Sequence, residues 1–371
     1  MGSYFWAVVV VAVYTLVGLR PLHGPLPLGA VSGMLGYLID ELPFLAIYWL
    51  VGWSVVIVVA GDPGTVQWVT LGIAGLTVLG LLEIIRRAAL TGPAVRTTLA
   101  HDLGRTPPAR SWLRRWCRIL LAPVPLFDPR VERTANLSYG DAGRRHRLDL
   151  YHRRGGHEPG APVLIHFHGG HFRTGGKSRE ARPLLHRFAR RGWVCVSAAY
   201  RLGAAGAFPR SLVDAKAVVA WVRRHAQEYG VDPSVVVVAG SSAGAHLASM
   251  VALTPDEPAF QPGFEDEDTS VAGAVCLYGF LGERDPSSAL PSSPTAYLGP
   301  DAPPFFVAHG TDDTLVPVAW ARRFVDRLRR ASTNQVAYLE LPGAQHSFDN
   351  FHSLRFEQVV DAIEVFTDEV C

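Results

Sequence analysis

The pentapeptide GSSAG at 240–244 places Ser242 between an apolar run and a helical pattern. The run Val235–Ala239 is typical of a buried strand, and 245–250 continues as a helix. A serine at the apex of such a strand–turn–helix needs small neighbours, because the turn is strained and brings backbone segments close together. The two glycines supply that room. The pattern therefore predicts a nucleophile elbow at Ser242, with an ordinary glycine-bounded turn as the alternative.

The chain from 135 to 371 alternates short apolar runs with helical patterns. The expected strands are His146–Tyr151, Pro162–His166, Trp193–Ala198, Val235–Ala239, Val271–Leu277, Pro304–Ala308 and Val336–Leu341, and the expected helices are Arg182–Arg191, Leu212–Gln227, Ala243–Leu253, Val318–Ala331 and Phe356–Glu369. Short apolar strands alternating with helices predict an α/β fold with a mostly parallel, doubly wound sheet. Ligands bind such sheets at the carboxyl ends of the strands.

A glycine turn follows the expected strand Pro162–His166. In the segment His168-Gly169-Gly170, two glycines allow backbone N–H groups to turn toward a developing oxyanion. The N–H of Ala243, directly after the candidate nucleophile, would complete an oxyanion hole with Gly169 and Gly170. Nearby histidines could instead be metal ligands, but no carboxylate or cysteine cluster supports a metal site. We therefore expect no metal.

An acid and a base follow the last two expected strands. Asp312 and Asp313 come after Pro304–Ala308, and His346 comes after Val336–Leu341. A carboxylate at the first position can orient an imidazole at the second. The two aspartates compete for this role. Serine, aspartate and histidine in this chain order, each after a strand, are typical of the catalytic triad of α/β-hydrolases.

The first ninety residues are predicted to form a membrane anchor of two or three helices. Tyr4–Leu19 and Leu42–Ala60 contain no charge, and Val66–Ile85 contains only Glu83. About 20 apolar residues cross the hydrocarbon core, so the second and third stretches are long enough, whereas the first is near the minimum. A bundle of buried core helices is the alternative.

The basic residues predict how this anchor is oriented. Arginines are frequent after Glu83, whereas the loop at 61–64 has none. The positive-inside rule therefore places this loop outside and the rest of the chain in the cytoplasm. Residues 91–134 form a basic linker, in which Pro107-Pro108 precede an amphipathic pattern at Ser111–Leu121, with Trp112 and Trp116 on its apolar side. That helix could lie at the membrane interface or cap the catalytic domain. The formal charge of +2 gives no reason to expect nucleic acid.

Taken together, the chain from 135 onward resembles the α/β-hydrolase carboxylesterases of the hormone-sensitive-lipase and bacterial esterase group. The whole chain is similar to membrane-anchored carboxylesterases of actinobacteria. The resemblance implies hydrolysis of short- to medium-chain esters without a cofactor, through an acyl-enzyme on Ser242. It implies Asp313 as the triad acid and Asp312 as the runner-up. An acyltransferase or amidase with the same triad is the alternative function.

Two departures from that group affect the expected pocket. His171 stands where many members have a third glycine, and the segment 280–303 is too short for a large lid. We therefore expect Thr106–Arg130 to roof the pocket. We also expect neutral esters, because no motif places an arginine or lysine to bind a substrate carboxylate.

Overall fold

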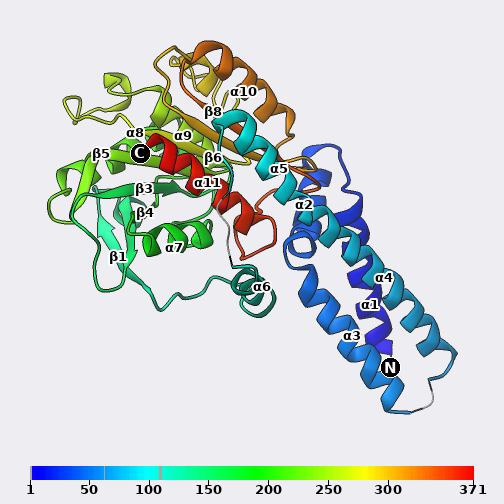
Figure 1. The fold of residues 1–371 in the computed structure, drawn as a ribbon. Coiled ribbons are helices and arrows are strands. Elements are labelled where there is room, and N and C mark those ends of the chain that lie inside the picture. Colours follow the sequence, from blue (N-terminus) through cyan, green and yellow to red (C-terminus); the bar gives the residue numbers. More distant parts are fainter. Residues whose placement is uncertain (1, 62, 108–110) are drawn as a thin grey trace.

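The computed structural model describes residues 2–61, 63–107 and 111–371. Asp62 of the predicted outer loop and Pro108 of the predicted linker lie outside these ranges. For Trp112, the structure describes the backbone and not the side chain. Two parts are visible in Figure 1: a domain built on a sheet, and a helical bundle that projects from it.

The sheet of the described chain has eight strands in the order β1-β2-β4-β3-β5-β6-β7-β8. Its strands are β1 (Val131–Ser138), β2 (Arg147–Arg153), β3 (Ala161–Phe167), β4 (Val194–Ala198), β5 (Val231–Ser241), β6 (Gly273–Leu277), β7 (Phe305–Gly310) and β8 (Val336–Leu341). The ladders from β4 to β8 are parallel, and β1 and β2 form an antiparallel edge. The predicted fold class is therefore confirmed. Strand β1 was not predicted, because only Val131 in it is buried.

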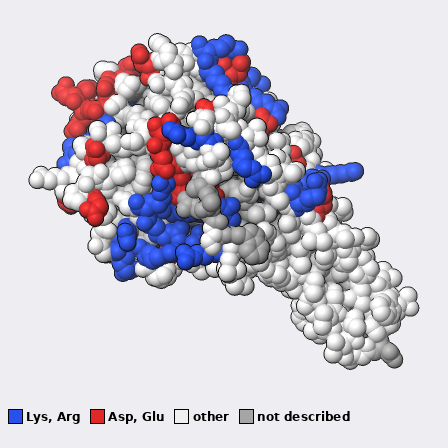
Figure 2. Space-filling view, in the orientation of Figure 1, with Lys and Arg blue, Asp and Glu red and all other residues white. Residues whose placement is uncertain are grey.

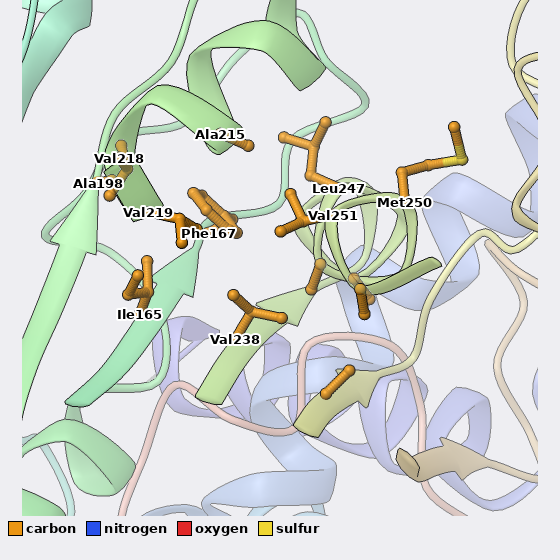
Figure 3. Packing of buried hydrophobic residues seen from close by; sticks show 14 of the residues in the cluster. Ile165, Phe167, Ala198, Ala215, Val218, Val219, Val238, Leu247, Met250 and Val251 are labelled. Carbon is orange, nitrogen blue, oxygen red and sulfur yellow. The ribbon is translucent and has the colours of Figure 1, made fainter. Parts of the chain in front are cut away.

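Helices cover both faces of the sheet. One core joins the sheet to α8 (Arg210–Arg224), α9 (Ala243–Leu253) and α10 (Ala319–Ala331). In Figure 3, Phe167 and Val238 of neighbouring strands point toward Val251 of α9. The other core joins the sheet to α7 (Arg182–Arg190), α11 (Phe356–Val370), α5 (Thr91–Thr98) and the short helix Leu99–Leu103. The parallel strands are thus buried on both sides, which explains their unbroken apolar sequence.

The projecting bundle contains α1 (Gly2–Leu19), α3 (Pro43–Val59) and α4 (Thr65–Ala89), and α2 (Leu26–Glu41) lies where the bundle meets the sheet domain (Figure 1). Helix Thr65–Leu103 runs on from α4 through α5 and, among the described residues, is the single helix long and apolar enough to cross a membrane. The pair Pro27–Glu41 and Pro43–Val59 meets the same standard only as one span bent by 75°.

The predicted linker is partly built into the sheet domain. Val95 and Leu99 are buried in the second core, and Thr98 donates a hydrogen bond to the carbonyl of Tyr338 on β8. Farther on, α6 (Trp112–Leu121) forms the predicted amphipathic helix. It contacts the bundle through a ring contact between Trp116 and Phe44, whose centroids are 5.9 Å apart.

Candidate active site

Ser242 occupies the turn between β5 and α9. Its φ of 55° and ψ of −114° are rare for a residue with a side chain, as expected for a strained elbow. A Cβ at Gly240 would lie 2.1 Å from the carbonyl oxygen of Gly244, and one at Gly244 would lie 1.9 Å from that of Phe167. Only glycine fits at these two positions, because the helix passes so close to the strands.

Three predicted residues meet at this turn. The Nε2 atom of His346 is 2.9 Å from the Ser242 Oγ atom, and its Nδ1 atom is 2.7 Å from the Asp313 Oδ2 atom. All three side chains are buried, with at most 6% of each residue exposed. A carboxylate, an imidazole and a hydroxyl joined in this order can move a proton away from the hydroxyl.

The carboxylate of Asp313 is held on several sides. Its Oδ1 atom accepts hydrogen bonds from the backbone N–H groups of Leu315 and Val316, and His309 lies 3.3 Å from its Oδ2 atom. Burial raises the pKa of Asp313, but the charge of His346 and hydrogen bonds from both histidines outweigh it and keep the pKa below its ordinary value. Asp312, by contrast, accepts a hydrogen bond from the Thr311 hydroxyl. The structure thus brings Asp313 into contact with His346.

The two glycines of the predicted oxyanion loop differ in the hydrogen bonding of their N–H groups. The N–H of Gly169 donates to the buried carboxylate of Glu180 and is therefore occupied. Gly170 has a φ of 116°, and a Cβ there would lie 2.2 Å from the carbonyl oxygen of Thr174. Within the described chain, the N–H of Gly170 has no acceptor, and that of Ala243 lies in the first turn of α9, where a helix leaves N–H groups unpaired.

A second buried polar group adjoins His346 and was not predicted. The carboxylate of Asp349 accepts hydrogen bonds from Ser241 and Tyr278, and the Tyr278 ring packs against His346 at 4.5 Å. Burial, and then the charge of Asp349, raises the pKa of Glu180 to about 7. Asp349 follows His346 by three residues, but no spacing in the sequence distinguishes either carboxylate from a surface acid.

A cavity of about 810 Å³ opens beside Ser242. Its lining comprises His171, Phe172, Arg173, Gly203, Ala204, Ser242, Ala243, Phe280, Glu283, Arg284, Leu315 and Val316. The expected roof from Thr106–Arg130 is not found among the described residues that line it. Instead, α6 pairs with α11, through Arg115 with Asp361 and Arg118 with Glu357.

Helix α2 supports the loop that carries the acid. The Thr314 hydroxyl donates a 2.8 Å hydrogen bond to the carbonyl of Gly29, and Arg355 bonds the carbonyl of Asp40 at 2.8 Å. A Cβ at Gly29 would lie only 2.4 Å from the backbone oxygen of Thr314. This helix was not predicted from the sequence. In the structure, Gly29 allows the helix to approach the acid loop closely.

The arrangement does not suggest a metal centre. Across residues 2–61, 63–107 and 111–371, no group of three or more His, Cys, Asp or Glu side chains could hold a metal ion. His166 faces the Ser241 hydroxyl at 3.0 Å, and His168 stacks on Tyr200 with ring centroids 4.4 Å apart. These histidines therefore pack and hydrogen-bond within the core beneath the elbow.

Known proteins with a similar sequence are ester hydrolases. The family model BD-FAE matches residues 148–282. The chain is 39% identical over 339 residues to the probable carboxylic ester hydrolase LipM of Mycobacterium tuberculosis, covering 82% of this chain and 78% of the relative. It is 37% identical over 302 residues to esterase LipQ of the same organism, covering 74% and 71%.

Solved structures agree with this likeness. Esterase 2 of Thermogutta terrifontis superposes with a TM-score of 0.56 at 27% identity, over 66% of this chain and 97% of that one. The sequence likeness extends over four fifths of the chain. It indicates the same family as the parallel sheet with its serine elbow. The chain belongs to the carboxylic ester hydrolases of the hormone-sensitive-lipase type, with an α/β-hydrolase fold.

Proposed function

We propose that this hydrolase cleaves short- to medium-chain carboxylic esters through an acyl-enzyme on Ser242. The observation that carries the proposal is the hydrogen-bonded series Ser242, His346 and Asp313 beside the 810 Å³ cavity. His346 takes the proton of the Ser242 hydroxyl as its oxygen attacks the ester carbonyl. Asp313 holds the imidazole in the required tautomer and stabilises the imidazolium.

The tetrahedral intermediate then needs donors for its oxyanion. The N–H groups of Gly170 and Ala243 are free for this role, whereas Gly169 must first leave Glu180 to join them. Each such donor typically contributes about 3 kcal/mol to transition-state stabilisation. His346 next protonates the leaving alcohol, and water repeats the sequence on the acyl-enzyme to release the acid.

Hydrolysis of 4-nitrophenyl esters from acetate to palmitate by the detergent-solubilised full chain tests this function. We expect an optimum at short to medium chains and a fall of at least about 10⁴-fold in kcat for Ser242→Ala. Ser234→Ala, an exposed serine at the start of β5, is the matched control and should retain full activity. Hydrolysis that survives Ser242→Ala, or a folded enzyme inactive on every ester but active in acyl transfer or on amides, would contradict the proposal.

We further propose that α1, α3 and α4 span the cell membrane and hold the catalytic domain on its cytoplasmic side. Apolar side chains cover the outside of the bundle, with Val59 80% and Leu76 71% exposed, and the bundle is almost free of charge in Figure 2. Exposed Trp6 and Trp68 lie near the starts of α1 and α4, at the end far from the domain, as in an interfacial aromatic belt.

The charges at the other end of the bundle support this orientation. Arg20 follows α1, and Arg86 and Arg87 lie in the last turn of α4, where Arg87 also bonds the carbonyl of Leu19 at 2.9 Å. A membrane-impermeant maleimide applied to intact cells tests the topology. We expect Gly64→Cys to be labelled from outside and Cys371 to be labelled only after lysis. Labelling of Cys371 in intact cells would contradict this orientation and place the catalytic domain outside the cell.

Helix α6 fits the membrane surface beside this bundle. Arg115 and Arg118 pair with acids of the sheet domain, whereas Leu113 and Leu121 are 62% and 79% exposed. Leu126 and Phe127 extend this apolar surface at 76% and 72% exposure. A helix that exposes leucines next to arginines is typical of an interfacial helix. A spin label on exposed Cys117 in nanodiscs should show high oxygen accessibility, and water-like values equal to those at Cys371 would exclude this placement.

A further inference from the structure

Two arginines reach the same cavity as Ser242, although no sequence motif predicts them. Arg173 lies in the loop after Gly170, and Arg284 lies in the segment after β6. Within the described residues, neither guanidinium forms an ion pair with a carboxylate. Glu283 also lines the cavity but is exposed. His171 adds no charge near neutral pH, because burial, and then the charge of His346, lowers its pKa. The lining therefore carries an excess of positive charge.

Arg284 is held rigidly in this wall. Its guanidinium carbon lies 3.7 Å from the centre of the Phe172 ring, an arrangement that favours a cation. Its Nη1 atom donates to the Ser211 hydroxyl at 2.5 Å, and its Nη2 atom donates to the carbonyl of Gly206 at 2.6 Å. Two of its five N–H donors are thus used, and both acceptors are neutral. The remaining donors are available on a half-buried cation.

The aromatic residues around Arg284 fix its position relative to the elbow. The Phe172 ring meets His246 of α9 edge to face, with centroids 5.6 Å apart, and His246 stacks on Phe280 at 6.0 Å. His246 lies one helical turn after Ser242, on the same helix that the elbow begins. The cation is therefore anchored, through aromatic contacts, to the element that positions the nucleophile.

A cation held out of bulk water without a carboxylate partner is costly unless an anion joins it. We propose that Arg284, assisted by Arg173, binds an anionic group of the substrate, so that the preferred substrate is an ester carrying a carboxylate or phosphate near the scissile carbonyl. This inference rests on the proposed function and replaces the expectation of neutral esters. A bound carboxylate or phosphate would pair with the free guanidinium donors in a bidentate manner.

A matched pair of esters tests the substrate class in the full-length enzyme. The anionic ester 4-nitrophenyl hydrogen glutarate and the neutral 4-nitrophenyl pentanoate have similar length and the same leaving group. We expect the anionic ester to have the higher kcat/KM at low ionic strength. Arg284→Met should lower the ratio of the two kcat/KM values by about 10-fold or more, and Arg284→Lys should restore part of it. Phenyl phosphate and benzoate as competitive inhibitors then distinguish a phosphate from a carboxylate site.

Controls separate recognition of charge from damage to the fold. Arg330→Gln, on the exposed face of α10, should leave the ratio unchanged. If Arg284→Met does not fold, the salt dependence of the wild type decides, since added salt should lower kcat/KM for the anionic ester alone. An equal preference for both esters that neither salt nor these substitutions alter would overturn the inference.

Binding without turnover distinguishes this inference from the proposed function. Calorimetry with Ser242→Ala should show that the anionic ester binds more tightly than the neutral one. Tighter anion binding together with no hydrolysis by the wild type would refute the proposed reaction and leave the anion site intact. Equal binding together with normal hydrolysis of both esters would refute the anion site alone.

Discussion

Helices α10 and α6 both carry apolar residues along one face and arginines along the other, yet they contact the protein differently. In α10, Phe324 and Leu328 are buried on the sheet, and the arginines point to solvent. In α6, Arg115 and Arg118 pair with acids of α11, and Leu113 is exposed. Of its apolar residues, Ile119 is buried. Periodicity therefore identifies an apolar face, but the partner available to that face decides whether it is buried in protein.

The same contrast separates the sheet domain from the bundle. The domain buries its apolar side chains together with a few polar groups that have defined partners, such as Asp313 and Asp349. The bundle exposes apolar side chains along its whole length. We therefore expect substitutions to act through packing and buried charge in the domain, and through the surrounding lipid or detergent in the bundle.

The largest expected effect concerns the buried carboxylates of the sheet domain. Asp313→Asn should lower kcat by about 10⁴-fold, because the amide no longer holds His346 in its catalytic tautomer. Asp312→Asn, one residue away and without contact to His346, should change kcat by less than about threefold. Steady-state hydrolysis of a 4-nitrophenyl ester measures both. Equal losses at the two positions would contradict the assignment of the acid.

The second-largest effect is expected in the stability of variants on the two amphipathic helices, α10 and α6. Phe324→Ala removes a ring that is 1% exposed and should lower the free energy of unfolding by about 3–5 kcal/mol. Leu113→Ala on α6 should change it by less than about 0.5 kcal/mol, because this side chain is mostly exposed and has little protein packing to lose. Denaturant unfolding in detergent compares the two variants. A large loss at Leu113 would mean that this side chain packs on protein.

A smaller effect is expected from the pH dependence at Glu180. Its pKa is raised to about 7 by burial and by Asp349, so the unfolded chain loses this proton at lower pH than the folded one. Stability should therefore fall as pH rises from about 4.5 to 7, by up to about 3 kcal/mol.

Glu180→Gln keeps an acceptor for the Gly169 N–H and removes the titration. The stability of this variant relative to wild type should therefore rise with pH across the same window. Unfolding curves at several pH values measure the difference. Parallel pH profiles of the two proteins would show that Glu180 titrates normally.

The smallest effect lies at the contact between the bundle and the domain. Gly29→Ala places a methyl group against the backbone of Thr314, beside the acid, and should cost about 1–3 kcal/mol and lower kcat. Gly52→Ala, on α3 with nothing within 4 Å of the added carbon, is the matched control. Thermal unfolding and kcat measure both variants. Identical behaviour would show that α2 does not support the acid loop.

Much of the fold could be predicted because parallel strands buried on both faces have a strong apolar signal. This apolar signal is absent from segments at the edge of the sheet and outside it. Strand β1 is mostly exposed and polar, and Gly29 of α2 is explained only by its approach to Thr314. The roof expected from 106–130 was misplaced because amphipathicity does not say which surface a helix covers.

The candidate site shows the same limit. Ser242, Asp313 and His346 could be predicted because each follows a strand in a fixed chain order, and the structure places them within hydrogen-bond distance. Their catalytic roles stay predictions. Arg284 and Glu180 could not be identified, because their environments depend on contacts between segments far apart in the chain.

The central claim is that Ser242 is the nucleophile, and covalent labelling tests it most directly. A fluorophosphonate reacts with a serine only where a base and an oxyanion hole activate it. Mass spectrometry of the full-length protein should find one label per chain, on the peptide that contains Ser242, and none in Ser242→Ala. A label on Ser241 or elsewhere, or no label on the folded wild-type enzyme, would contradict the account.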